Sequence, residues 1–210
     1  MQPILRNAED FTWVFSIILG IGILFILLKF SFYKSFKALG NIKVFTEIEE
    51  NILPFALTIH LILGCLVGIC LYPFLNLPYG LWQDLRLHLA LVIATCSIFL
   101  IIKFLINTLI FYFTNERGEF RNIVRSKVFY KVYLALILLI GNLLLYYSSI
   151  EPLYILYSML GFFVITSLIE YYRQASNGKI FKYMNSYYFI LYLCILEILP
   201  ILYLYNHWYR

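Results

Sequence analysis

The stretch "ILPFALTIHLILGCLVGICLYP", residues 52–73, is apolar along its whole length and contains no Asp, Glu, Lys or Arg. A helix needs about 20 mostly apolar residues to cross a bilayer, so this stretch is long enough to span one. Further runs of this kind lie at about 11–30, 88–113, 131–149, 153–172 and 187–205. Because backbone groups inside lipid must pair within their own segment, we predict an all-α polytopic transmembrane bundle of six spans, forming a single domain over residues 1–210.

The composition supports a chain that is solvated by lipid. Of its 210 residues, 63% are hydrophobic and 13% are charged, and the mean hydropathy is +0.86. A soluble domain is about half apolar and about a quarter charged, so a single core cannot hide this much apolar surface. Aromatic residues reach 20%, and many tyrosines lie near the ends of apolar runs, where rings line membrane interfaces.

Lysine and arginine are distributed unequally between the two sets of connections. Twelve lie at or within alternate connections: Lys29, Lys34, Lys37, Lys43, Arg117, Arg121, Arg125, Lys127, Lys131, Arg173, Lys179 and Lys182. The other side carries Arg6, Arg86 and Arg210. Because cytoplasmic loops carry the excess of positive charge, we expect the twelve to face the cytoplasm and both termini to face the periplasm.

The connections themselves predict different structures. The segment "SFYKSFKALG" (31–40) is consistent with either an interfacial helix or a solvated loop. The charged segment "FTNERGEFRNIVRSK" (113–127) is expected to form a loop along the cytoplasmic face, and "SSIEP" (148–152) is short enough to require a tight antiparallel hairpin.

The start of the second span carries a capping signal. In "TEIEENILPF" (46–55), Thr46 and Glu49 have capping-box spacing ahead of an apolar run. This spacing predicts a helix that begins on the surface and enters the membrane near Pro54, which would kink it.

Polar side chains fall inside the predicted spans, where an ionisable group costs roughly 2.5–3.5 kcal/mol on insertion and usually faces the bundle interior. They are Lys103, Glu197, His60 and the neutral Asn142. At a rise of ~1.5 Å per residue, the three ionisable groups lie ~12–16 Å from the predicted cytoplasmic ends of their spans. We therefore expect them near one plane, where they meet if spans two, three and six are neighbours.

The helical faces favour a pairing between Lys103 and Glu197. Span three has a narrow polar stripe, because four side chains lie within about 20° of one line at 100° per residue: Cys96, Lys103, Asn107 and Thr114. In the sixth span, Pro200 lacks an N–H and leaves the carbonyl of Leu196 free beside Glu197. A lysine ammonium has three donors and can satisfy both the carboxylate and this carbonyl.

The predicted pair has three interpretations. It is a structural ion pair that fixes helix register, with His60 hydrogen-bonded nearby, or a relay for protons or ions, or part of a catalytic centre. A Glu, a Lys and a His without a nucleophile or metal set give little support to an enzyme, so catalysis is the third choice.

Small and sulfur-containing residues complete the candidate positions. Gly64 and Gly68 have the small-xxx-small spacing that suits close helix packing. The cysteines lie in apolar runs without metal-ligand spacing, so we expect neither a metal nor a disulfide framework: Cys65, Cys70, Cys96 and Cys194. The basic clusters are better explained by topology and anionic lipid than by nucleic acid, and no cofactor is expected.

Three segments carry distinctive motifs: the closing "YLCILEILPILYLY" (192–205), the lysine-bearing "FLIIKFLINTLIFYF" (99–113) and the opening "EDFTWVFSIILG" (9–20). Together they resemble the Bacteroidota domain-of-unknown-function 4271 family of inner-membrane proteins. The resemblance covers most of the chain and is specific in the last span and around Lys103. It marks Lys103, Glu197 and Pro200 as motif residues, and it implies a Gram-negative inner membrane but no established activity.

The sequence thus favours an integral inner-membrane protein that works without a cofactor, as a non-enzymatic subunit or scaffold of a cell-envelope assembly. Short outer connections and the lack of a large soluble domain suit a chain with membrane-protein partners. The alternative is a small proton-coupled transporter or channel that uses Glu197, Lys103 and His60.

Overall fold

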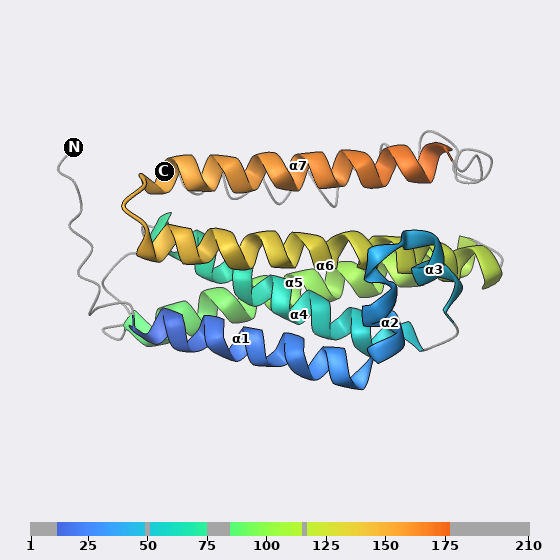
Figure 1. The fold of residues 1–210 in the computed structure, drawn as a ribbon, viewed down its shortest axis with the longest axis horizontal. Helices are drawn as coiled ribbons and strands as arrows, with labels where there is room; N and C mark the ends of the chain where they lie inside the picture. Colours follow the sequence, from blue (N-terminus) through green and yellow to red (C-terminus); the bar gives the residue numbers. More distant parts are fainter. Residues whose placement is uncertain (1–11, 49–50, 75–84, 115–116, 177–210) are drawn as a thin grey trace.

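A computed structural model describes residues 12–48, 51–74, 85–114 and 117–176, and no strand occurs in these ranges. The helices are α1 (Thr12–Ser31), α2 (Tyr33–Lys37), η2 (Ala38–Gly40), α3 (Ile42–Glu47), α4 (Ile52–Leu71), η3 (Tyr72–Phe74), α5 (Leu85–Thr114), α6 (Arg117–Tyr147) and α7 (Pro152–Ser176). Figure 1 shows the five long helices lying along a common axis, with α2 and α3 gathered at one end.

Five segments of these helices are long and apolar enough to cross a membrane, which makes the chain a multi-pass membrane protein. They are Thr12–Ser31, Ile52–Phe74, Leu89–Ile106, Val124–Tyr147 and Pro152–Glu170. The all-helical class predicted from the sequence is confirmed for the described residues. The predicted sixth span at 187–205 lies outside them, so the number of six remains a prediction.

Helices that follow one another run in opposite directions. Trp13, at the start of α1, stacks edge-on against Tyr72, just after the end of α4, with ring centroids 6.0 Å apart. Gly141 near the end of α6 contacts Met159 in the first half of α7, across the short 148–151 connection. The predicted hairpin at this connection is therefore confirmed, and the alternation places α2, α3 and the start of α6 at the same end of the bundle (Figure 1).

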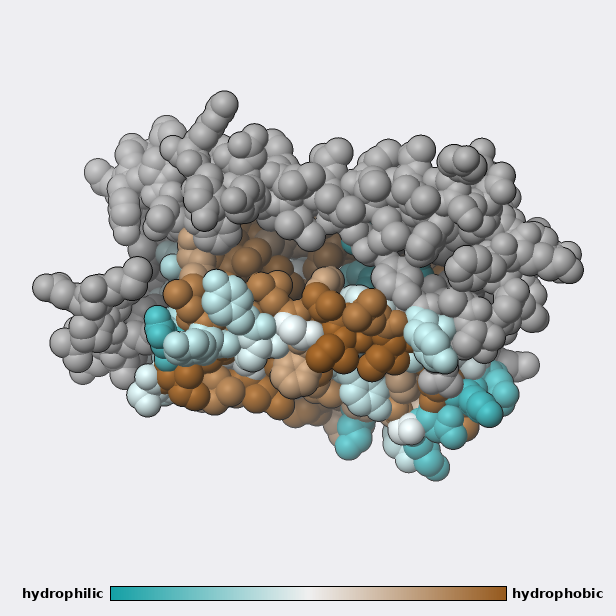
Figure 2. Space-filling model, turned by 90° about the horizontal axis from the view of Figure 1, so that it is seen from above, coloured by the Kyte–Doolittle hydropathy of each residue, from teal (hydrophilic) through white to brown (hydrophobic). Residues whose placement is uncertain are grey.

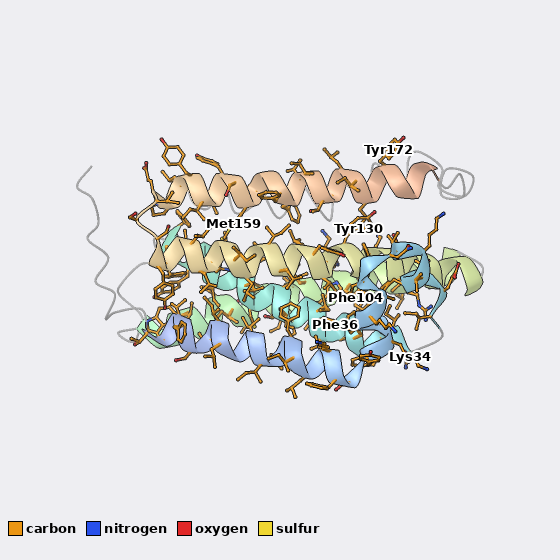
Figure 3. All side chains as sticks on the ribbon, in the orientation of Figure 1. Lys34, Phe36, Phe104, Tyr130, Met159 and Tyr172 are labelled. Carbon is orange, nitrogen blue, oxygen red and sulfur yellow. The ribbon has the colours of Figure 1, made fainter. Side chains whose placement is uncertain are left out.

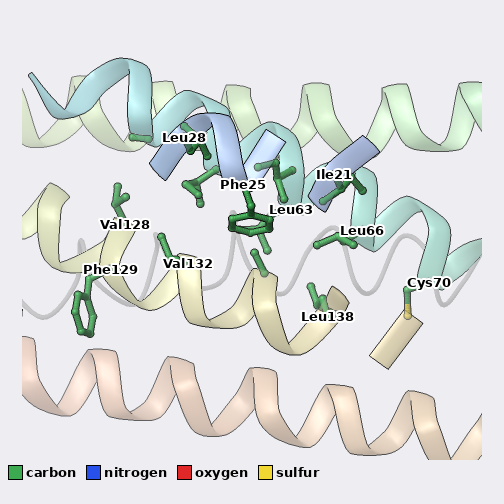
Figure 4. Packing of buried hydrophobic residues seen from close by; sticks show 14 of the residues in the cluster. Ile21, Phe25, Leu28, Leu63, Leu66, Cys70, Val128, Phe129, Val132 and Leu138 are labelled. Atoms are coloured by element: carbon green, nitrogen blue, oxygen red, sulfur yellow. The ribbon is translucent and has the colours of Figure 1, made fainter. Parts of the chain in front are cut away.

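Helix α4 forms the centre of the core. Its fully buried side chains recur at helical spacing: Phe55, Ile59, Ile62, Leu66 and Ile69. Helix α4 packs mainly against α5 and α6 and makes a smaller contact with α1. Figure 4 shows apolar side chains of α1, such as Phe25, meeting Leu63 of α4, with Val132 of α6 on the other side. In contrast, 11% of the spanning window of α7 is buried, against 56% for α4.

The predicted surface loop at 113–127 is wrong. Helix α5 continues to Thr114 and α6 begins at Arg117, so most of the charged segment is the first part of a 31-residue helix. Arg, Glu and Lys are good helix formers, and a helix that leaves the membrane continues in water without breaking its hydrogen bonds. The apolar window of α6 begins at Val124, which is seven residues earlier than the predicted start at 131.

The predicted capping box at Thr46 and Glu49 is also wrong. Helix α3 ends at Glu47, where Ile48 takes an extended conformation (φ −63°, ψ 137°), and α4 begins anew at Ile52. The cap of α4 is Asn51, whose side chain accepts a hydrogen bond from the backbone N–H of Leu53 at 3.2 Å. A second helix start replaces the single long helix that the capping-box spacing suggested.

Pro54 therefore does not lie at a kink inside a longer helix. It is the third residue of α4, within the first turn, where a backbone N–H has no intrahelical partner. Its missing N–H costs no hydrogen bond there, and its fixed φ suits the start of a helix.

The helical interpretation of residues 31–40 is confirmed. Helix α2 and the 3₁₀ turn η2 occupy most of the segment, and Ser35 and Ala38 are buried against the bundle. Phe36 and Leu39 also pack against the core, which excludes a solvated loop at this position.

Candidate functional site

Polar side chains are concentrated where α6 packs against α4. The central contact joins His60 of α4, which is 1% exposed, to the half-buried Lys131 of α6. The Nζ atom of Lys131 lies 2.5 Å from Nε2 of His60, and the other ring nitrogen, Nδ1, lies 2.7 Å from the carbonyl oxygen of Ala56. Both residues lie within the segments of α4 and α6 that are long and apolar enough to cross a membrane.

The two partners of His60 assign its tautomer. A carbonyl oxygen can only accept a hydrogen bond, so Nδ1 of His60 carries the ring proton and donates a hydrogen bond to the carbonyl of Ala56. The other ring nitrogen, Nε2, accepts a hydrogen bond from the ammonium of Lys131. The carbonyl of Ala56 is four residues before His60, so this bond holds the ring against its own helix.

An aromatic ring of α5 completes the surroundings of His60. Phe104 is buried, and its centroid lies 4.3 Å from that of the His60 ring, with an interplanar angle of 38°. The same ring lies 6.0 Å from Nζ of Lys131, within the range of a cation–π contact. Three helices, α4, α5 and α6, therefore meet at this site.

Two further side chains of α6 donate hydrogen bonds to backbone carbonyls of α4. The amide of Asn142, which is fully buried, donates to the carbonyl of Leu66 on α4 at 3.0 Å and to that of Leu138 on its own helix at 2.9 Å. One turn later, the hydroxyl of Tyr146 donates to the carbonyl of Ile69 at 2.8 Å. Both helices run in the same direction here, because partners on α4 and on α6 advance together along the chain.

The polar contacts of α6 continue at the end of the bundle. Arg125 is 2% exposed, and its Nη1 donates a hydrogen bond to the carbonyl of Thr46 at 2.9 Å. Tyr133 donates to the carbonyl of Leu39 at 2.5 Å. These bonds join α6 to η2 and α3 in the same way that Asn142 joins it to α4.

The residues predicted from the sequence are only partly described. His60 and Asn142 both lie in the α4–α6 interface, and the α4 carbonyl that Asn142 contacts, that of Leu66, comes after His60 along α4. Lys103 lies on α5 and is half-buried, and Phe104, the next residue, is the α5 side chain that contacts His60. Asn107 also belongs to α5, but its side chain lies outside the description.

Glu197 and Pro200 lie outside the described residues, so the Lys103–Glu197 pair remains a prediction. Lys131 and Arg125 were not predicted as interior residues, because they follow other basic residues in what the sequence indicates is a connection. A signal for Lys131 was present: it precedes Asn142 by eleven residues, which places the two within about 20° on one helical face.

Glycines of α4 allow α5 to approach closely. A Cβ atom on Gly64 would overlap the backbone and side chain of Ser97, and one on Gly68 would lie 2.8 Å from Cα of Ile93. Real Cβ contacts of this length are not found, and the neighbouring atoms are backbone atoms that cannot rotate away. These two positions therefore hold the helices at a separation that no other residue type permits.

Other groups in the described part of the chain do not assemble into a reactive centre. The cysteines described there, Cys65, Cys70 and Cys96, are free thiols. Residues 12–48, 51–74, 85–114 and 117–176 contain no group of three His, Cys, Asp or Glu that could hold a metal ion. An open groove of about 710 Å³ lies between α1 and α5, with Trp13 and Ile93 among its walls.

This arrangement can do two things chemically. Its hydrogen bonds run from side chains of α6 to carbonyls of other helices, so they fix the position of α6 against its neighbours. The His60–Lys131 contact also places two basic nitrogens at hydrogen-bond distance, and a proton can pass between them.

Comparison with known proteins identifies a family and no characterised relative. No curated protein and no solved structure matches the chain. The family described as Domain of unknown function (DUF4271) matches residues 14–207, which is nearly the whole chain. The chain therefore belongs to the DUF4271 family.

Proposed function

We propose that this protein is a non-enzymatic subunit or scaffold of a cell-envelope assembly in a bacterial inner membrane. The observation that carries the proposal is that the polar side chains in the interior form hydrogen bonds between helices. Asn142, Tyr146 and Arg125 each donate to a backbone carbonyl of another helix, as structural contacts between helices do. In a site built for transport or catalysis, such groups would instead face a cavity.

The outer helices support a role with partners in the membrane. Helix α7 contacts α6 along one side, and large apolar and aromatic side chains cover the rest of its surface, including Tyr154, Tyr157 and Phe162. Figure 3 shows Met159 between α6 and α7, and Tyr172 pointing away from the bundle. Such a surface suits either lipid or the helices of other subunits.

The proposal includes the predicted Lys103–Glu197 pair as a structural contact and the predicted orientation. Both termini lie in the periplasm, the basic connections lie in the cytoplasm, and the bacteria concerned are the Bacteroidota, as the family resemblance implies. A reporter that is active on one side of the membrane only, fused to the C-terminus at Arg210, tests this orientation directly.

Affinity purification from native membranes tests the scaffold. The tagged full-length chain is extracted in mild detergent and its companions are identified by mass spectrometry, with an unrelated tagged multi-pass protein as the control. We expect the same membrane proteins to co-purify with the wild type and with Lys103→Met combined with Glu197→Gln. Recovery of this chain alone would count against a subunit.

A small proton-coupled transporter or channel is the second candidate. The observation in its favour is the contact of His60 with Lys131, which brings two ionisable groups together inside a span. This candidate uses Glu197, Lys103 and His60, and it predicts that Lys103→Met or Glu197→Gln alone abolishes proton flux into proteoliposomes while the protein still folds. Unchanged flux in both variants would exclude it.

A further inference from the structure

The structure carries a second site at one end of the bundle, distinct from the α4–α6 interface. We define the basic cap as α2, η2 and α3 (residues 33–47), which lies between the end of α1 and the start of α4. Figure 2 shows strongly hydrophilic side chains gathered at this end of the molecule, next to a hydrophobic body. We propose that the basic cap binds the headgroups of anionic phospholipids.

The inner face of the basic cap is fixed to the bundle. Phe45 of α3 is 1% exposed, and its ring centroid lies 6.3 Å from that of Phe55 and 5.6 Å from that of Phe129. The bonds from Arg125 and Tyr133 to carbonyls of the cap add to this packing. The cap is therefore packed onto the bundle rather than being a loose connection, and its backbone holds the attachment points of its outer side chains in place.

The outer face carries the charge that an anionic headgroup requires. Lys34, Lys37 and Lys43 are exposed on the cap, and Lys29 is exposed at the end of α1. Figure 3 shows Lys34 at the outer edge of α2. Among the described residues of the cap, these positive charges are opposed by one exposed acidic residue, Glu47. A lysine ammonium binds phosphate as a compact point charge, and its long side chain reaches from the apolar boundary to the headgroup.

Exposed apolar side chains beside the lysines favour lipid over a soluble anion. Phe30 is 76% exposed, Tyr33 is 59% exposed and Val44 is 50% exposed. Aromatic rings of this kind lie at the level of the headgroups in membrane proteins, and the cap lies between the end of the α1 span and the start of the α4 span. Basic and apolar groups side by side match the phosphate and the acyl chains of one phospholipid.

Native mass spectrometry of the full-length protein tests the proposal. The detergent-solubilised chain is titrated with phosphatidylglycerol, or with phosphatidylcholine of the same acyl chains. We expect preferential retention of phosphatidylglycerol by the wild type, and a loss of affinity on the order of fivefold for each lysine removed in K34Q/K37Q/K43Q. The matched variant K34R/K37R/K43R keeps the charge and should keep the preference, and Glu47→Gln should strengthen it.

These side chains are exposed, so the variants should unfold at the wild-type temperature, and this is checked on the same samples. Full retention of the lipid preference by K34Q/K37Q/K43Q would overturn the proposal and leave an acidic protein as the partner of these lysines. Complete displacement of phosphatidylglycerol by inorganic phosphate would overturn it as well, because the apolar groups would then contribute nothing. Neither result depends on whether the protein is a scaffold.

Discussion

Helices α4 and α7 are both apolar enough to cross a membrane, yet 56% of the α4 window is buried inside the bundle and 11% of the α7 window. The difference lies in their small and polar contacts. Gly64 and Gly68 let α5 approach the backbone of α4, and two carbonyls of α4 accept hydrogen bonds from α6. On α7, Thr166 donates to carbonyls of its own helix, and a Cβ atom on Gly161 would meet no atom of another helix within 4 Å.

The comparison teaches that apolar character brings a helix into the membrane but does not decide its place there. Lipid tails are as apolar as leucine, so burial of apolar surface gives no preference for protein over lipid. Close packing and hydrogen bonds between helices supply that preference, and α4 has both. If this explanation is correct, substitutions at the contacts of α4 should destabilise the protein more than matched substitutions on α7.

Asn142→Asp should destabilise the protein most. The change keeps the shape of the side chain but replaces an amide donor that faces the carbonyls of Leu66 and Leu138 by a carboxyl group. We expect a loss of about 3–5 kcal/mol in the free energy of unfolding, because a buried charge is left uncompensated. Titration from mild detergent into sodium dodecyl sulfate, followed by tryptophan fluorescence, measures it.

The matched control is Asn51→Asp at the start of α4. Asn51 accepts a hydrogen bond from the N–H of Leu53, and an aspartate accepts the same bond at a helix N-terminus. Its free energy of unfolding should equal that of the wild type or exceed it slightly. Equal losses in the two variants would mean that the orientation of the Asn142 amide is unimportant.

Ile62→Ala and Ile165→Ala compare the same truncation in the two helices. Ile62 of α4 is 0% exposed and Ile165 of α7 is 53% exposed. The change at Ile62 leaves a cavity and should lower the free energy of unfolding by about 2–5 kcal/mol. Lipid fills the space left by the change at Ile165, so that change should have little effect on the free energy of unfolding. The same titration checks both, and a costly Ile165→Ala would show that α7 is covered by protein.

Gly64→Ala and Gly161→Ala compare the two kinds of glycine. The new methyl group at Gly64 overlaps the backbone of Ser97, so α4 and α5 must separate, at a cost of about 1–3 kcal/mol. At Gly161 the methyl group enters open space, and the better helix propensity of alanine should stabilise α7 by up to about 1 kcal/mol. Opposite signs in thermal unfolding are the expected result.

Tyr146→Phe should have the smallest effect of the series. It removes the hydrogen bond from the buried hydroxyl to the carbonyl of Ile69 and should cost about 1 kcal/mol. Tyr157→Phe on α7, where the side chain is 64% exposed, is the control and should leave the free energy of unfolding unchanged. If both changes have the same effect, the bond to Ile69 is not stabilising.

The helices were largely predictable from the sequence, because runs of about 20 apolar residues have one solution in lipid. The residues at which the helices begin and end were less predictable. Charged residues at 117–123 read as a loop although they extend α6, and the spacing of Thr46 and Glu49 suggested a cap that Asn51 provides instead. Charge and spacing indicate where a helix leaves the membrane, but not whether its hydrogen bonds continue beyond that point.

The sequence indicated some of the residues of the candidate site, but it did not indicate which residues contact each other. His60 and Asn142 stand out as polar residues in apolar runs, but nothing local assigns Lys131 to His60, since the two are 71 residues apart. Their contact depends on α4 and α6 being parallel neighbours with α5 beside them. That arrangement follows from packing over the whole bundle, and the hydrophobic periodicity of a single helix does not predict which helices are its neighbours.

Polar contacts between α4 and α6 stabilise this bundle, and a double-mutant cycle on His60 and Lys131 measures the contribution of one such contact. The free energy of unfolding is measured for the wild type, His60→Leu, Lys131→Met and the double variant. The cycle cancels any other interaction of Lys131 that is independent of His60. We predict a coupling free energy of about 1–3 kcal/mol between the two residues. Additive losses, with no coupling, would contradict the claim.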